Sequence, residues 1–288
     1  MSCKVILPCK KFLTLTFAGS YHGWQLEPTG LTVEEVLNGA LTGLLGEEIR
    51  VSGASRTDAG VHALGNLCVF DTESPIPPEK IAPALLGRLP EDIAVRASRE
   101  VPADFHPRRC DSVKTYEYTI YRDTLPNPLV RRQSYFFYRP LDVEAMRRAG
   151  AYLVGEHDFK SFCAAGSQAE TTVRRILSLT VREDGPFLRI EVKGTGFLYN
   201  MVRIIAGTLI KAGLGQLDPE KIPAVLAAAD RRLAGPTAPP EGLCLKKIEL
   251  YPEGFPPELL NPEGIRPELS DPEEFLPERK EGGENGSE

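Results

Sequence analysis

Segments with the apolar period of a strand alternate with segments that have the period of a helix through most of the chain. Phe12 to Phe17 alternates apolar residues with threonines, as a half-buried strand does. Thr32 and Glu35 form a capping box, an apolar helical face follows, and Gly46 ends it. The order strand, helix, strand recurs in the second half. It predicts an α+β protein of two halves, each a mainly antiparallel sheet with helices packed on it, facing a cleft.

The same patterning predicts the remaining elements and three regions. Further strands are expected at 66–70, 93–97, 116–121, 177–182, 187–193 and 245–250, with a hairpin turn at 184–185. Further helices are expected at 80–89, 142–155 and 199–212, and after 218. A polar, basic segment at 105–113 predicts a boundary between an N-terminal half, 1–107, and a C-terminal half, 108–251. Residues 252–288 are rich in Pro, Glu and Gly, and we expect a disordered acidic tail there.

The charge of the chain is unevenly distributed. The net charge is -6, but residues 251–288 contribute eleven acidic and three basic side chains, or -8. The remaining 31 basic and 29 acidic side chains give residues 1–250 a net charge of +2. The part expected to fold is therefore slightly cationic, which permits the binding of a polyanion without requiring it.

Residue spacing argues against several other classes of protein. No apolar run approaches the roughly 18 to 20 residues of a membrane span, and the apolar run at the N-terminus is too short for a secretory signal. The six cysteines form no C-x-x-C pair, and no two histidines lie three to five residues apart, so no metal site is expected. We expect a cytoplasmic protein without a metal or an organic cofactor.

The run from Gly53 to Ala63 carries the clearest chemical information. Small residues surround Asp58 and allow a sharp turn that exposes its carboxylate. Arg56 lies two residues away, and a nearby guanidinium would lower the pKa of the aspartate and keep it an anionic nucleophile. The same pattern also fits a surface loop with an ordinary Arg–Asp pair. The residues alone leave both interpretations open.

This run resembles the G-x-G-R-T-D-A-G-V-H-A motif of the tRNA pseudouridine synthase A family. Ser55 replaces a glycine that is usual in the family, and Asn66 replaces a glutamine. Five further segments resemble family motifs in the same order along the chain: Gly23-Trp24-Gln25, Lys114-Thr115-Tyr116-Glu117-Tyr118, Gly155-Glu156-His157-Asp158-Phe159, Gly196 to Arg203, and Gly235 to Leu245.

The resemblance implies a fold, an activity and a set of site residues. It implies the pseudouridine synthase fold with a central RNA-binding cleft, and isomerisation of uridine to pseudouridine at positions 38, 39 and 40 of the tRNA anticodon arm. It also implies a homodimer. Asp58 would be the nucleophile, Arg56 would hold the target nucleotide out of its stack, Tyr116 would pack on the uracil, and Arg203 would pair with Asp58. Leu243 or Leu245 would line the base pocket, and basic residues that include Arg108 and Arg109 would bind phosphates.

Two other functions are compatible with parts of the pattern. A tRNA chaperone of the same fold would bind RNA without turnover, but it would not need the carboxylate of Asp58. A glycoside or phosphoester hydrolase would need a second carboxylate as general acid, or a metal cluster, and no motif for either stands out. His62 is expected to be structural, whereas Trp24 suits the core and an RNA-facing surface equally well.

Overall fold

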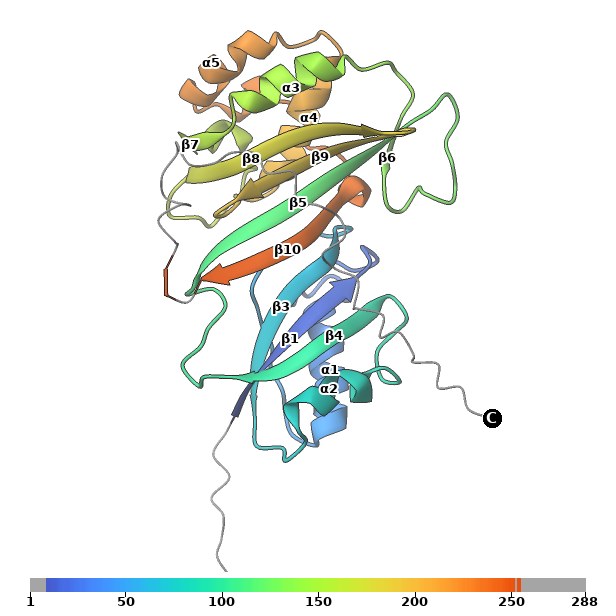
Figure 1. Ribbon diagram of the computed structural model, residues 1–288, viewed down its shortest axis with the longest axis vertical. Helices are drawn as coiled ribbons and strands as arrows, with labels where there is room; N and C mark the ends of the chain where they lie inside the picture. The colour runs from blue at the N-terminus through green and yellow to red at the C-terminus, as the bar shows by residue number, and fades with distance from the viewer. Residues whose placement is uncertain (1–8, 252, 255–288) are drawn as a thin grey trace, which may run out of the picture.

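A computed structural model describes residues 9–251, 253 and 254 of the chain. Within this part, ten strands form one sheet in the order β4-β1-β3-β10-β5-β9-β8-β7, with β2 paired to β3 and β6 to β5 (Figure 1). The strands are β1 (Cys9–Phe17), β2 (Ser52–Gly53), β3 (His62–Thr72), β4 (Ile93–Val101), β5 (Asp111–Arg122), β6 (Tyr135–Phe137), β7 (Gly155–Asp158), β8 (Val173–Asp184), β9 (Phe187–Gly194) and β10 (Leu243–Tyr251). The α-helices are α1 (Val33–Leu45), α2 (Pro78–Leu85), α3 (Val143–Ala151), α4 (Met201–Gly213) and α5 (Ile222–Ala227).

The sheet is mixed and mainly antiparallel, as the α+β prediction requires. Its parallel pairs among the described strands are β3 with β10 and β5 with β6. The expectation of a separate sheet in each half is wrong, because β10 joins them. Cys244 and Leu245 pair with His62 and Ala63 of β3, while the other edge of β10 pairs along β5. The division into residues 1–107 and 108–251 stays a prediction, and the expected tail at 252–288 lies almost entirely outside the described residues.

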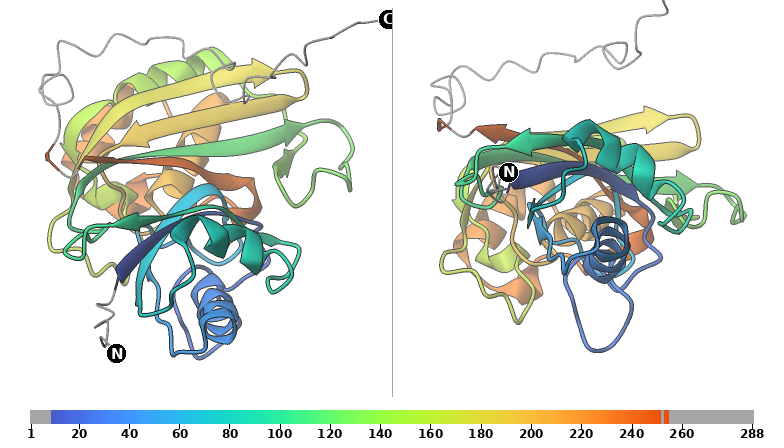
Figure 2. Two further views of the ribbon diagram at one scale, coloured as in Figure 1. Left: turned by 60° about the horizontal axis from the view of Figure 1, so that its bottom comes forward. Right: turned by 90° about the horizontal axis from the view of Figure 1, so that it is seen from below.

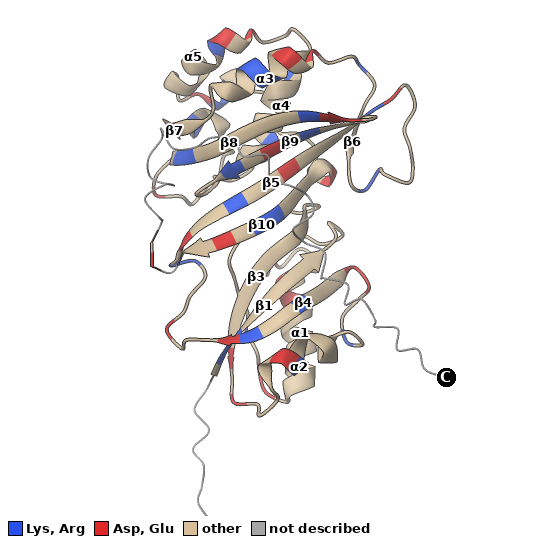
Figure 3. Cartoon of the chain, viewed as in Figure 1, with Lys and Arg blue, Asp and Glu red and all other residues tan. Residues whose placement is uncertain are grey.

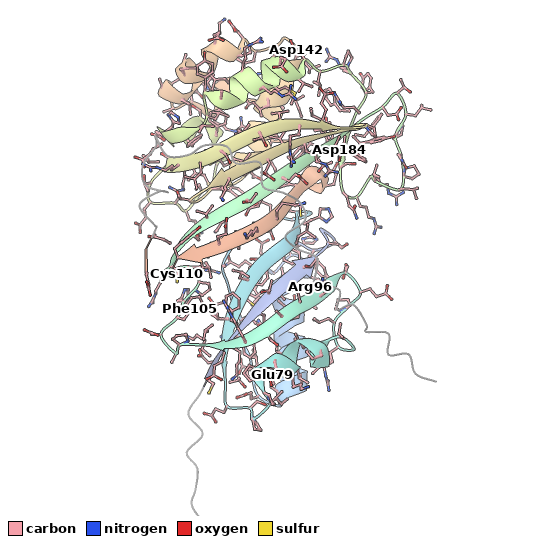
Figure 4. The ribbon with its side chains drawn as sticks, viewed as in Figure 1. Glu79, Arg96, Phe105, Cys110, Asp142 and Asp184 are labelled. Carbon is pink, nitrogen blue, oxygen red and sulfur yellow. The ribbon has the colours of Figure 1, made fainter. Side chains whose placement is uncertain are left out.

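Local sequence signals account for several element boundaries. The Thr32 side chain accepts a hydrogen bond from the Glu35 backbone N–H, and α1 ends at Gly46 with φ +74°. Gly185 turns the β8–β9 hairpin with φ +55°, next to Asp184 (Figure 4). The helix capped by Asp142 is shorter than expected: α3 ends at Ala151, and Gly155 already begins β7.

The two faces of the sheet have different surroundings. Figure 2 shows α1 and α4 on the same side of the sheet. Along β9, residues Leu188, Ile190 and Val192 are fully buried on one face, and the alternate residues are partly exposed on the other. On that second face, Glu117 forms ion pairs with Arg189 at 3.2 Å, with Lys246 at 3.3 Å and with Arg182 at 3.6 Å. Figure 3 shows charges of both signs along β5, β8, β9 and β10.

Candidate active site

The loop that carries Asp58 connects β2 to β3 and is shaped by glycines. The Val61 N–H donates to the Asp58 carbonyl at 3.1 Å, and Gly60 adopts φ +80° in the turn between them. A Cβ on Gly60 would also lie 2.9 Å from the ring of Pro240. Gly23, with φ +87°, lies against the loop, where a Cβ would meet the Thr57 carbonyl oxygen at 2.6 Å. Larger residues at these two positions would displace the backbone that holds Asp58.

The carboxylate of Asp58 faces a guanidinium from the second half of the chain. Arg203 Nη1 lies 3.6 Å from Asp58 Oδ2. Arg203 is itself fixed at the start of α4, where it donates to the Ala238 carbonyl and to Asn200 Oδ1, both at 2.7 Å. Asn200 adopts φ +59°, a conformation that asparagine tolerates better than most residues. The start of α4 therefore holds the guanidinium of Arg203 close to the carboxylate of Asp58.

Burial and the ion pair shift the pKa of Asp58 in opposite directions. Partial burial raises the pKa of this carboxyl above its ordinary value, and Arg203 offsets only part of that effect. The contact with Asp58 that the resemblance implies for Arg203 is present, and the guanidinium that lowers the pKa of Asp58 is that of Arg203 rather than that of Arg56. The Arg56 side chain is exposed, and the guanidinium paired with Asp58 is 145 positions further along the chain.

Tyr116 is buried on β5 and held by two contacts. Its hydroxyl lies 3.1 Å from the Ser55 hydroxyl, and its ring meets the ring of Phe197 edge to face with centroids 5.2 Å apart. Burial raises the pKa of Tyr116 to about 12, so the phenol keeps its proton at neutral pH. Asn66 Nδ2 donates to the Ser55 carbonyl at 3.1 Å. The two residues that depart from the family motif, Ser55 and Asn66, are thus in direct contact.

These side chains surround a cavity of about 970 Å³. That volume is near the upper end of the roughly 300–1,000 Å³ typical of ligand pockets. Its walls come from the Asp58 loop, β5, the start of β10, the segment before α4, and the loop residues 166–169. The cavity therefore brings together a carboxylate, a neutral phenol and apolar side chains at the meeting point of β3, β5 and β10.

Comparison with known proteins assigns this arrangement to a family. The family model described as tRNA pseudouridine synthase matches residues 19–108 and 149–251. The tRNA pseudouridine synthase A of Moorella thermoacetica is 50% identical over 246 residues, which cover 84% of this chain and 100% of the relative. That of Geobacter sulfurreducens is 46% identical over 237 residues, which cover 82% of this chain and 97% of the relative. The chain belongs to the tRNA pseudouridine synthase family.

In this family member, most of the predicted site residues meet at the cavity. Its lining includes Asp58, Arg56, Tyr116, Arg108 and Leu243, and Arg203 reaches it through the contact with Asp58. Two predicted residues are absent from the lining. Leu245 is fully buried between its strand partners Ala63 and Tyr116, and Arg109 is exposed outside the cavity. Of the two leucines, Leu243 is therefore the one that can contact a ligand.

Trp24, whose interpretation was open, and His62, which was expected to be structural, both have structural contacts in this synthase family member. Trp24 is fully buried, and its backbone N–H donates to the Thr57 carbonyl at 3.1 Å. His62 Nδ1 accepts a hydrogen bond from the Gly19 N–H at 2.9 Å, and its Nε2 contacts the Arg132 carbonyl. Burial lowers the pKa of His62, which favours the neutral ring that both contacts require. Trp24 thus contacts the Asp58 loop through its backbone, and His62 connects the segments that contain Gly19 and Arg132.

Sequence reasoning missed three contributors to the site of this synthase family member. Phe197 and the hydroxyl of Ser55 both contact Tyr116, which is distant from them in sequence, so local periodicity gives no signal for them. Asn200 lies three residues before Arg203, but the apolar pattern of a helix start does not indicate a side-chain hydrogen bond. Only their place inside family motifs could have indicated them.

In the part of the chain that the structure describes, no helix is long and apolar enough to cross a membrane.

Proposed function

We propose that the chain isomerises uridine to pseudouridine in tRNA, at positions 38, 39 and 40 of the anticodon arm, with Asp58 as the nucleophile. The observation that carries the proposal is the pairing of Asp58 with Arg203 inside a cavity that also presents Tyr116. Both relatives described above are named tRNA pseudouridine synthase A, which supports the same activity.

The reaction explains why these residue types are combined. It breaks the bond between N1 of uracil and C1′ of ribose, rotates the base, and joins C5 to C1′, while the C5 proton leaves and N1 gains one. Nothing is oxidised or reduced. A carboxylate can attack the sugar or the base, or assist departure of the uracil, and Asp58 suits each of these routes. The Arg203 guanidinium keeps the carboxylate anionic against the effect of burial.

Tyr116, Arg56 and Leu243 would receive the target base. A paired uridine must leave its stack before a side chain can reach its reacting atoms. The Tyr116 ring offers a face or an edge in place of the lost neighbours, and its neutral hydroxyl can donate one hydrogen bond and accept another. We assign Arg56 to holding the target nucleotide out of its stack, because its exposed side chain lies at the lining of the cavity that contains Asp58.

A carboxylate inside the cavity distinguishes an enzyme from a non-catalytic tRNA chaperone. An anionic side chain repels RNA phosphates, and its raised pKa shows that burial disfavours the charge. A binding protein gains nothing from this arrangement, whereas a catalyst needs it. A carboxyl group whose pKa is shifted by burial and by a specific charged partner is typical of catalytic sites in cavities.

The direct test is to incubate the purified full-length protein with unmodified tRNA and map pseudouridine by chemical labelling. We expect conversion at positions 38, 39 and 40, with activity retained after EDTA dialysis. Absence of pseudouridine would refute the enzyme. Activity lost on dialysis and restored by one divalent metal, but not by agents that refold tRNA, would refute metal independence. Sedimentation of the protein with and without tRNA tests the homodimer, which we propose from the family resemblance.

A further inference from the structure

Three cationic side chains lie together at the lining of the cavity. Arg56 comes from the loop after β2, Arg108 from the segment between β4 and β5, and Lys114 from β5 itself. Figure 4 labels Phe105 and Cys110, which flank Arg108 in the connecting segment. The three charges affect one another: burial and Arg56 lower the pKa of Arg108, and burial and Arg108 lower that of Lys114 to about 8.

Two of these cations are anchored to neighbouring backbone carbonyls. Arg108 Nε donates to the Gly53 carbonyl at 2.7 Å, and Lys114 Nζ donates to the Ala54 carbonyl at 3.3 Å. These carbonyls belong to consecutive residues at the end of β2, so the two side chains are held side by side. A guanidinium has five N–H donors and an ammonium has three, and each therefore keeps donors for a ligand.

No anionic side chain neutralises the cluster within the described residues. None of the three cations forms an ion pair with a carboxylate there. Glu34 of α1 attracts Arg108, but this effect is smaller than burial and the repulsion by Arg56. Like charges that share a partly buried wall without a counter-ion raise the free energy of the folded protein. An anion bound between them would remove that cost.

We infer that Arg56, Arg108 and Lys114 form a subsite for one phosphodiester of the RNA backbone, and that Arg109 is not part of it. The inference rests on the proposed function, since it supplies the RNA. Asp58 lines the same cavity, so the phosphate belongs to the target nucleotide or to one of its immediate neighbours. Charge-assisted hydrogen bonds from a guanidinium fork and an ammonium suit a phosphate that must be held in one place.

The subsite couples RNA binding to the protonation of Lys114. Arg108 is the charged group that acts on Lys114, and both it and burial favour the neutral amine in the free protein. A bound phosphate favours the ammonium, so binding takes up a proton above about pH 8. Affinity for tRNA should therefore fall by about tenfold between pH 7 and pH 9 through this group.

The matched pair Arg108→Gln and Arg109→Gln tests the subsite. The two arginines are adjacent and exposed, but only Arg108 lines the cavity. Filter binding of unmodified tRNA at several salt concentrations should show that Arg108→Gln weakens binding several-fold and lowers the log–log salt slope by about one. Arg109→Gln should leave both unchanged. Equal effects of the two variants, or an unchanged slope for Arg108→Gln, would overturn the inference.

Lys114→Met provides an independent readout. Methionine keeps the length and removes the charge, and a thermal melt confirms that the variant is folded. The ratio of the dissociation constants at pH 9 and pH 7 should be about tenfold smaller in Lys114→Met than in wild type. Titration of the tRNA itself is common to both proteins and cancels in this comparison. Equal ratios would overturn the role of Lys114.

Pseudouridine formation by the wild-type protein is measured in parallel. Formation of pseudouridine together with equal binding by the two arginine variants would refute the subsite and leave the proposed function intact. A lack of pseudouridine together with the expected difference between the arginine variants would refute the function and leave the subsite in place.

Discussion

The carboxylate of Asp58 is kept in a position that is costly for a charged group. Partial burial raises its pKa, and the 3.6 Å contact with Arg203 compensates only in part. A group whose pKa is higher in the folded state than in the unfolded state stabilises the fold only while it is protonated. The stability that it contributes is lost as the pH rises through its folded pKa. The ionised carboxylate of Asp58 is therefore destabilising at neutral pH.

Replacing Asp58 with asparagine should consequently not destabilise the protein at neutral pH. Arg203 keeps its hydrogen bonds to Asn200 and Ala238, so the guanidinium is not left without partners. Thermal melts at pH 4 and pH 7 should show the variant gaining in melting temperature relative to wild type as the pH rises. A variant that melts lower than wild type at pH 7 would show that the ion pair outweighs burial.

The hydroxyl of Ser55 contacts the phenol hydroxyl of Tyr116. Its contact with Tyr116 at 3.1 Å joins two buried oxygen atoms. Ser55→Ala should lower stability by about 1 kcal/mol, the typical loss when one hydrogen-bond partner is removed. It should also lower the single-turnover rate and leave tRNA affinity unchanged, because Tyr116 loses its orientation. Ser52→Ala on β2 is the control, and equal rates in the two variants would contradict a positioning role.

At the level of elements, the sequence predicted the helix ends and turns that depend on local hydrogen bonds. Thr32, Gly46 and the Asp184-Gly185 pair each act through neighbours within four residues, which is why their elements were predicted. The end of α3 was misplaced because the residues after Ala151 remain apolar, and apolar composition alone does not distinguish a helix end from the strand that follows.

The cap of α1 gives a quantitative test of this local control. The Thr32 side chain accepts from the Glu35 N–H at 3.3 Å and is fully buried. Thr32→Ala should cost about 1 kcal/mol of unfolding free energy in urea denaturation. Thr32→Ser keeps the hydroxyl and should cost less. If serine and alanine were equally destabilising, packing of the threonine methyl group rather than capping would explain the loss.

The pairing of strands that are distant in the sequence could not be predicted from the sequence. The order of strands depends on β10, which returns from the end of the folded region to lie between β3 and β5. The apolar pattern of residues 245–250 predicted a strand but contained nothing about its partners. The same limit applies to the candidate site: Asp58, Tyr116, Arg203 and the pairing of Arg203 with Asp58 were predicted from the family motifs, whereas the contacts of Tyr116 with Ser55 and Phe197 were not predicted.

At the scale of the whole molecule, the uneven distribution of charge should affect RNA binding. Residues 252–288 carry a net charge of -8, and every motif lies before them. Deleting them should preserve folding and isomerisation, and should leave tRNA affinity equal or tighter because repulsion of the RNA is reduced. Filter binding at fixed salt compares the two proteins. A truncated protein that aggregates, or that binds tRNA more weakly, would contradict this expectation.

The central claim is that the carboxylate of Asp58 performs the chemistry while other groups bind the RNA. Asp58→Asn is nearly isosteric, so the loop between β2 and β3 should keep its shape, but an amide is a very poor nucleophile. The decisive measurement is single-turnover release of tritium from tRNA labelled at C5 of uridine, with a filter-binding curve for the same protein. We predict a loss of at least about a thousandfold in rate, or roughly 4 kcal/mol, with affinity within a few-fold of wild type. A folded variant that keeps more than a tenth of the wild-type rate would contradict the account.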